Sequence, residues 1–172
     1  MKKYLTEFIG TLFLVLIIGL TQNPLAIGFG LTVLVYMGAH ISGAHYNPVV
    51  SLAMFIKKEI SGDDFFKYII AQILGAALAA YLVFTLSSNM TIQPNLDESV
   101  YQILLAEVLF TYLLVLVILN VACHPNLKEN SFYGLAIGLT VMAGAYSVGG
   151  LSGGVFNPVS YTHLRAHETI AD

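Results

Sequence analysis

The stretch that decides the fold is His40-Ile41-Ser42-Gly43-Ala44-His45-Tyr46-Asn47-Pro48-Val49. Its pattern returns near the end of the chain as Gly150-Leu151-Ser152-Gly153-Gly154-Val155-Phe156-Asn157-Pro158-Val159. Each copy has Ser-Gly in a polar loop, then an aromatic residue, then Asn-Pro at the start of an apolar run. Because Asn is a strong helix N-cap and Pro suits the first helical position, each copy predicts a helix that begins at Asn-Pro. Such a helix start presents free N–H donors and the positive end of the helix dipole.

The match between the two copies extends beyond the motif and indicates an internal duplication. At an offset of 110 residues, Ala26-Ile27-Gly28 returns as Ala136-Ile137-Gly138. Upstream, Glu7 has a counterpart in Glu107 at an offset of 100 residues. Chance similarity between apolar helices does not place both Asn-Pro loops in register.

The composition is that of an integral membrane protein. Of the 172 residues, 57% are hydrophobic and 10% are charged, and the mean hydropathy is +0.79. A soluble domain is less apolar and carries more charge. The lysines lie at span ends and form no basic patch, so no nucleic-acid partner is expected. Cys123 is the single cysteine, which allows no internal disulfide.

Five segments are long and apolar enough to serve as membrane spans, since a span needs roughly 20 residues. They are Tyr4–Leu20, Leu25–Ala39, Phe65–Leu86, Val100–Val121 and Phe132–Val148. After the first Asn-Pro, Val49–Ile56 makes about two helical turns and reaches only partway across the bilayer. We therefore predict an all-α membrane protein built as an inverted repeat, each half having three spans plus one re-entrant half-helix, with the sixth span lacking here.

The lysines predict the orientation. Six of them fall on one face: Lys2, Lys3, Lys57, Lys58, Lys67 and Lys128. The loops of the other face contain Asp97 and Glu98 but no Lys or Arg. By the positive-inside rule, the amino terminus lies in the cytoplasm. The odd number of spans between the two Asn-Pro loops then places these loops on opposite sides of the membrane.

Irregular backbone at membrane depth is tolerated where it is buried or lines a wet cavity. We therefore expect the loop residues before each Asn-Pro to expose a ladder of carbonyls along a pore. They are Gly43, Ala44, His45, Tyr46, Gly153, Gly154, Val155 and Phe156. Pro48 and Pro158 begin the two half-helices, and Asn47 and Asn157 meet near the centre as paired donors. The alternative is that each Asn only caps its own helix.

The doubled Asn-Pro loop and the two glutamates resemble those of the aquaporin and glycerol-facilitator family, the major intrinsic proteins. The resemblance covers about residues 1–158. It implies six spans and two half-helices, a homotetramer in the cell membrane with a pore in each subunit, and passive movement of water or small neutral solutes without a cofactor. Val49 and Val159 stand where the family usually has Ala after Asn-Pro.

Ionisable residues inside spans are functional candidates. The resemblance implies that Glu7 and Glu107 brace the half-helix loops through backbone amides, and a proton-coupled role is the alternative. We expect His45 to contribute its carbonyl and a side-chain bond that fixes the loop, and His40 to hold the loop at the cytoplasmic mouth. A metal site is not expected, because no carboxylate or Cys is spaced with these histidines.

The resemblance also implies a selectivity filter at Ile27, Ala145, Gly154 and Ser160. Ile27 stands where an aromatic residue is usual, Ala145 where water-selective members have His, and Ser160 where Arg is usual. These small or apolar residues predict a wide constriction that admits small neutral solutes such as glycerol alongside water.

The sequence also bears on two other classes of function. A proton- or ion-coupled inverted-repeat transporter that uses Glu7 and Glu107 is the alternative, since such proteins also contain broken helices. An enzyme is not expected, because no nucleophile–base pair or metal-ligand cluster is visible in the sequence.

The domain prediction is a channel domain over residues 1–158, with repeat one at about 4–86 and an incomplete repeat two at about 100–158. Residues 159–172 are polar and too short to cross a bilayer. We expect this tail to be non-native, so that Ser160 and Arg165 would have no functional meaning.

Overall fold

The computed structural model describes residues 1–87, 99–127 and 129–160. Its elements are α1 (Lys2–Thr21), α2 (Pro24–Ser42), α3 (Pro48–Ile56), α4 (Gly62–Leu86), α5 (Val100–Val121) and α6 (Tyr133–Ser152). All except α3 are long and apolar enough to cross a membrane. The five predicted spans and the half-helix are therefore present, in an all-helical fold over the described ranges. The predicted non-native tail falls largely on residues 161–172, outside the described residues.

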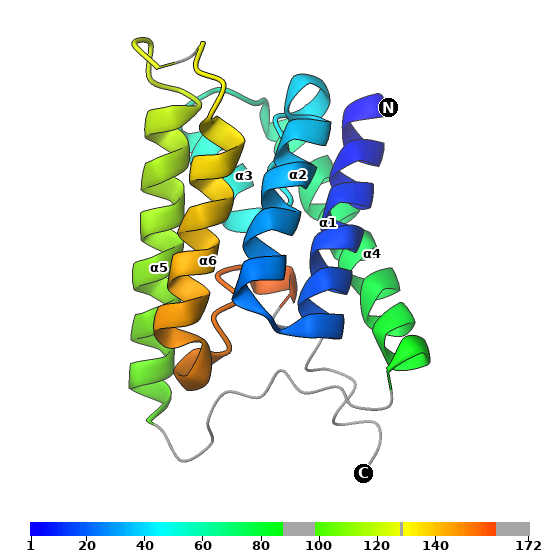
Figure 1. Cartoon of the computed structure of the whole chain (residues 1–172). Helices are drawn as coiled ribbons and strands as arrows, with labels where there is room; N and C mark the ends of the chain where they lie inside the picture. The colour runs from blue at the N-terminus through cyan, green and yellow to red at the C-terminus, as the bar shows by residue number, and fades with distance from the viewer. Residues whose placement is uncertain (88–98, 128, 161–172) are drawn as a thin grey trace.

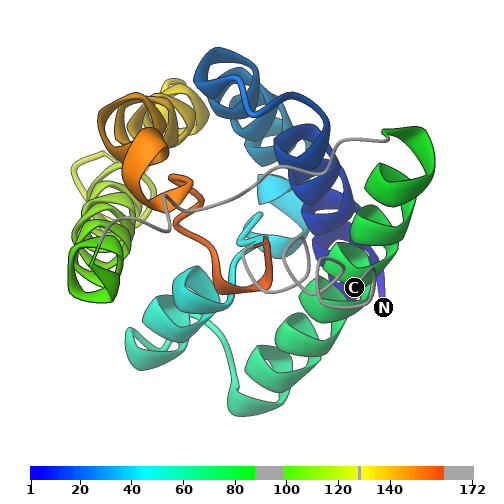
Figure 2. The same cartoon turned by 90° about the horizontal axis from the view of Figure 1, so that it is seen from below.

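The long helices form an open arc in the order α4, α1, α2, α6 and α5, and two segments enter the molecule from opposite ends (Figures 1 and 2). One is the first Asn-Pro loop with α3, which lies in the gap between α4 and α5 and runs back toward the end where α1 begins. The other is the loop after α6, which turns inward from the far end and becomes helical at residues 158–160. Within this arc α1 packs on α4, and α2 packs on α6.

Two helices end later than the sequence predicted. We had expected the loop to include Ser-Gly, but α2 and α6 continue to Ser42 and Ser152. The residues that follow, Gly43 and Gly153, adopt left-handed φ values of 88° and 92° and close the last helical turn. Glycine favours this C-terminal cap because it has no Cβ to clash. The Ser-Gly pair therefore ends a helix.

Helices α2 and α6 cross at two glycines that the 110-residue repeat relates to each other. A Cβ on Gly138 would lie 2.3 Å from the carbonyl oxygen of Gly28 and 2.0 Å from Oγ1 of Thr32. A Cβ on Gly28 would lie 2.8 Å from the Gly138 carbonyl oxygen. Small residues allow this close approach of backbones in lipid. The two halves of the chain therefore meet at equivalent positions.

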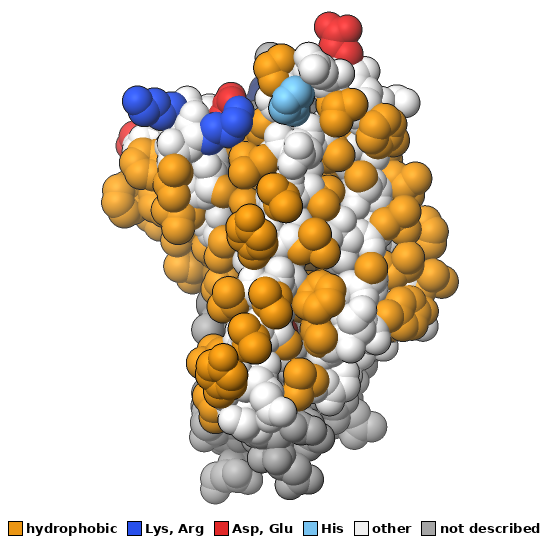
Figure 3. All heavy atoms as spheres, turned by 90° about the vertical axis from the view of Figure 1, so that its left-hand side faces the viewer, with side chains coloured by type: hydrophobic (Ala, Val, Ile, Leu, Met, Phe, Trp, Pro, Cys, Tyr) orange, Lys and Arg blue, Asp and Glu red, His pale blue; other side chains and the backbone are white. Residues whose placement is uncertain are grey.

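The outer surface is apolar apart from one end. Figure 3 shows hydrophobic side chains over the face that contains α5, with the charged side chains of this view gathered at one end. That end holds the starts of α1 and α4 and the end of α3, where five described lysines lie. Lys128, Asp97 and Glu98, on which the orientation also depends, lie outside the described residues.

Candidate functional site

Glu7 holds the backbone of the first Asn-Pro loop. The side chain is fully buried in α1. Its Oε1 accepts hydrogen bonds from Ser42 Oγ at 2.6 Å and from the His45 N–H at 2.9 Å. Its Oε2 accepts from the Tyr46 N–H at 2.7 Å and from Gln72 Nε2 at 2.9 Å. These four donors compensate for the burial of a carboxylate and fix the loop against α1 and α4.

Glu107 of α5 makes the equivalent contacts in the second repeat. It accepts from Ser152 Oγ at 2.6 Å, from the Val155 N–H at 3.3 Å and from the Phe156 N–H at 2.8 Å. The Gly154 N–H in turn donates to Ser152 Oγ at 3.1 Å. Glu107 differs from Glu7 in burial, because it remains partly exposed.

A further polar network joins the first loop to its half-helix. Gln72 Nε2 also donates to Ser51 Oγ at 2.9 Å, and this hydroxyl lies 3.1 Å from His45 Nδ1. All three side chains are buried. The second loop has Val155 in place of His45 and cannot repeat this contact. Sequence reasoning missed Gln72 and Ser51, and the signal for Gln72 was an uncharged polar residue in the middle of an apolar span.

The side chains of Asn47 and Asn157 bond across to the opposite loop. Nδ2 of Asn47 donates to the Phe156 carbonyl at 2.8 Å, and Nδ2 of Asn157 donates to the Tyr46 carbonyl at 2.9 Å. Oδ1 of Asn47 caps α3 by accepting from the Val49 N–H at 2.9 Å. Each amide nitrogen carries two hydrogens. The cross-loop bonds use one hydrogen of each amide nitrogen. The second hydrogen of each remains for a molecule in the cavity beside the two side chains.

The aromatic residue before the first Asn is anchored in a socket of glycines. A Cβ on Gly10 would lie 2.0 Å from Cε1 of Tyr46, and a Cβ on Gly38 would lie 1.8 Å from its hydroxyl oxygen. That hydroxyl donates to the Leu34 carbonyl at 3.0 Å. In the second loop, the buried Phe156 ring packs in the same way against Gly144, where a Cβ would lie 2.6 Å from its Cε2. The anchored rings hold the two carbonyls that accept from the Asn pair.

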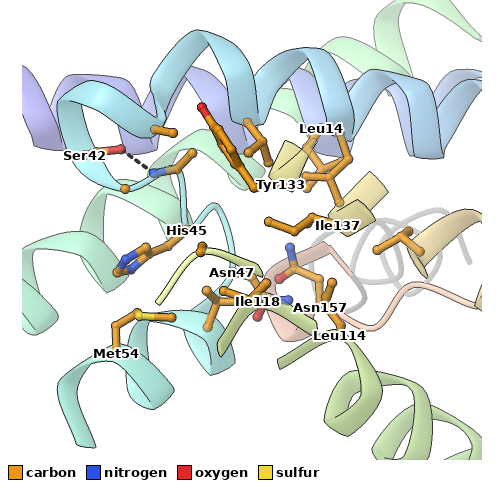
Figure 4. A pocket seen from close by; sticks show the side chains of 18 of the residues that line it. Leu14, Ser42, His45, Asn47, Met54, Leu114, Ile118, Tyr133, Ile137 and Asn157 are labelled. Atoms are coloured by element: carbon orange, nitrogen blue, oxygen red, sulfur yellow. Dashed lines mark hydrogen bonds between the residues drawn. The ribbon is translucent and has the colours of Figure 1, made fainter. Parts of the chain in front are cut away.

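A cavity of about 490 Å³ leads from the lysine-bearing end to the Asn pair (Figure 4). The loop residues Gly43, Ala44 and His45 line one wall. The facing wall is apolar and comprises Leu14, Ile18, Leu31, Val35, Leu114, Ile118, Ile137 and Val141. The polar lining comes mainly from the loop side, with Glu59 and Tyr133 as further polar groups. A small molecule would keep its hydrogen bonds to the carbonyls while its other face meets hydrocarbon.

The other predicted site residues are distributed unevenly. His40 lines the cavity but is exposed in the last turn of α2. It forms no hydrogen bond with the described residues, so the loop-holding contact that we predicted for it is not seen.

The four predicted filter residues, Ile27, Ala145, Gly154 and Ser160, are all buried and lie outside this cavity. Of these, Ala145 and Gly154 are brought together, since a Cβ on Gly154 would lie 3.0 Å from Cα of Ala145. No group of metal-binding side chains occurs among the described residues.

The sequence was compared with protein families. A family model described as Major intrinsic protein matches residues 1–162. The chain belongs to the major intrinsic protein family. As a member of this family it is an integral membrane channel and not an enzyme.

Relatives and solved structures agree with this assignment. The Glycerol uptake facilitator protein-like 6 of Lactiplantibacillus plantarum is 35% identical, over 92% of this chain and 80% of its own length. Aquaporin AqpM of Methanothermobacter thermautotrophicus is 31% identical, over 91% of this chain and 79% of its own. The aquaglyceroporin from Plasmodium falciparum has the same fold, with a TM-score of 0.84 at 23% identity over 99% of this chain and 81% of that one.

Proposed function

We propose that this major intrinsic protein conducts water and small neutral solutes such as glycerol passively, with cations and protons excluded at the Asn pair. The observation that carries this proposal is the reciprocal bonding of Asn47 and Asn157 to the opposite loops at the end of the cavity. The names of the relatives add support, since they include both a glycerol uptake facilitator and an aquaporin.

Exclusion of protons follows from the two half-helix starts. We expect the helix that begins at Pro48, and the one that the helical residues 158–160 begin in the second loop, to direct the positive ends of their dipoles at the same region, which repels cations. A water molecule that accepts from Asn47 and from Asn157 has its lone pairs occupied, so it cannot take a proton from the next water in the file. Carbonyls of the loops then accept from its hydrogens as it moves on.

Selectivity is assigned to Ile27, Ala145 and Gly154 at the other end of the pathway, and Ser160, in the tail that we expect to be non-native, is given no role. Small side chains at this constriction would admit the carbon skeleton of a polyol. Replacing Ala145 with His should narrow the opening and reduce glycerol flux more than water flux. Light scattering by reconstituted vesicles after osmotic shifts measures both. Fast water flux with no glycerol entry in the wild-type protein would show that this assignment is wrong.

The proposal extends to the assembly and the orientation. We propose a homotetramer with the channel domain in residues 1–158 and the amino terminus in the cytoplasm. Support for the assembly comes from membership of the major intrinsic protein family, in which the resemblance implies a homotetramer. The mass of the detergent-solubilised particle tests it, and a monomer in mild detergent would count against it.

A further inference from the structure

A shallow apolar groove lies between α1 and α4 on the outside of the molecule, away from the cavity of the Asn pair. It is lined by Tyr4, Phe8, Lys67, Ile70, Ala71 and Leu74. The groove exists because the residues of α4 that face α1 at this place are small. A Cβ on Gly75 would lie 2.5 Å from the Phe8 carbonyl oxygen, and Ala71 is buried. Ile70 and Leu74 stand beside it, 58% and 56% exposed.

Charged side chains of both signs lie at the top of this groove. Lys67 Nζ pairs with Asp63 Oδ2 at 2.5 Å, and the two side chains are 48% and 69% exposed. Lys67 also lies over the Tyr4 ring, 5.6 Å from its centre. The neighbouring Asp64 is less available, because its Oδ1 receives both Lys3 and the Tyr4 hydroxyl. The most exposed charges at the groove are therefore the Lys67 ammonium and the Asp63 carboxylate, side by side. Lys3, 38% exposed and 5.4 Å from the Tyr4 ring centre, is paired with Asp64.

We propose that this groove binds a phospholipid with a zwitterionic ethanolamine headgroup. The lipid phosphate lies at Lys67, the lipid ammonium donates to Asp63, and the upper part of an acyl chain lies between Phe8 and Leu74. The segment from Lys67 to Leu74 extends about 10 Å along α4, enough for the first several methylene groups of a chain. An ammonium with three N–H donors suits Asp63 better than the methylated ammonium of choline does. A purely anionic headgroup would compete with Asp63 for Lys67 and would supply no cation to Asp63 in return.

The absence of tryptophan from the sequence allows a direct test. A Phe8→Trp variant has a single tryptophan, which lies in the groove and can be excited selectively over the tyrosines, and lipids with brominated acyl chains quench it on contact. In vesicles of phosphatidylcholine with an added brominated lipid, brominated phosphatidylethanolamine should occupy the groove about two- to fivefold more strongly than brominated phosphatidylglycerol or phosphatidylcholine, as expected for exposed charge pairs. K67Q and D63N, each added to Phe8→Trp, should abolish the preference.

Matched controls separate this site from general contact with lipid. Lys57→Gln removes the lysine of another exposed pair, Lys57–Glu59, that borders no part of the groove, and should leave the preference intact. A Phe13→Trp variant places the fluorophore elsewhere on α1 and should show no lipid preference. Equal quenching by the three lipids at Phe8→Trp, stronger quenching by phosphatidylglycerol, or an unchanged preference in K67Q would each overturn the proposal.

Discussion

At the scale of single residues, the socket around Tyr46 gives the sharpest prediction. Gly38→Ala places a methyl group where the Tyr46 hydroxyl lies. We expect it to displace the ring and to lower the free energy of unfolding by about 1–3 kcal/mol, the usual cost of overpacking. Adding Tyr46→Phe removes the clashing oxygen and should restore part of the loss. Unfolding in detergent measures both, with Gly149→Ala as the control, since nothing lies within 4 Å of that position. If the changes in unfolding free energy caused by Gly38→Ala and Tyr46→Phe simply added in the double variant, the proposed contact between these two residues would be contradicted.

The two glutamates should respond unequally to the same substitution. Glu7→Gln turns one acceptor into a donor among four buried donors, and each group left unsatisfied costs about 1–3 kcal/mol. Glu107→Gln should cost less, because Glu107 is partly exposed and water can replace a lost partner. Thermal unfolding of both variants gives the comparison. An equal or greater loss for Glu107→Gln would show that burial does not set the difference.

Much of the site at this scale was predictable from the registered repeats, which identified both Asn residues and both glutamates. Gln72 stands out in the sequence as a polar residue within an apolar span, but its partners were not predictable, because they depend on which face of α4 meets α1. The hydrogen-bond partners of Asn47 could not be predicted from the sequence either. A side-chain amide can bond to any nearby carbonyl, and the carbonyl of Phe156 comes near only through the meeting of two distant loops.

At the scale of elements, the helices α2 and α6 depend on the contact between Gly28 and Gly138. Gly138→Leu should force these helices apart and lower both the unfolding temperature and the water flux, because the two halves of the chain meet there. Gly149→Leu adds the same side chain to the same helix in open space and serves as the control. Equal effects of the two substitutions would contradict this view of the crossing.

The existence and order of the helices were predictable, since length and apolarity decide them. The ends of α2 and α6 were predicted too early because Ser-Gly was assigned to the loop, whereas Gly43 and Gly153 form left-handed C-caps. Helix pairing was not predicted. The spacing of small residues shows which helices have a face where a neighbour can approach closely. It does not show which two helices meet at such a face.

At the scale of the whole molecule, the orientation is testable with introduced cysteines. In a Cys123→Ser background, Thr21→Cys lies at the end of α1 and Glu129→Cys lies between α5 and α6, both exposed. A membrane-impermeant maleimide should label Thr21→Cys in intact cells and Glu129→Cys only after permeabilisation, because lysine-rich loops stay in the cytoplasm. The reverse pattern would place the amino terminus outside.

Simultaneous measurement of water and proton flux in one set of vesicles separates a passive channel from a proton-coupled transporter. Vesicles that contain the protein and a trapped pH-sensitive dye are exposed to an osmotic shift and then to a pH gradient. We expect water flow well above that of protein-free vesicles and no added proton entry, since the two Asn amides interrupt the proton-conducting file. Asn47→Asp should reduce water flow and admit cations, because a carboxylate replaces the donor at the positive end of α3. Proton entry through the wild-type protein, or water flow no faster than in protein-free vesicles, would contradict the proposed channel.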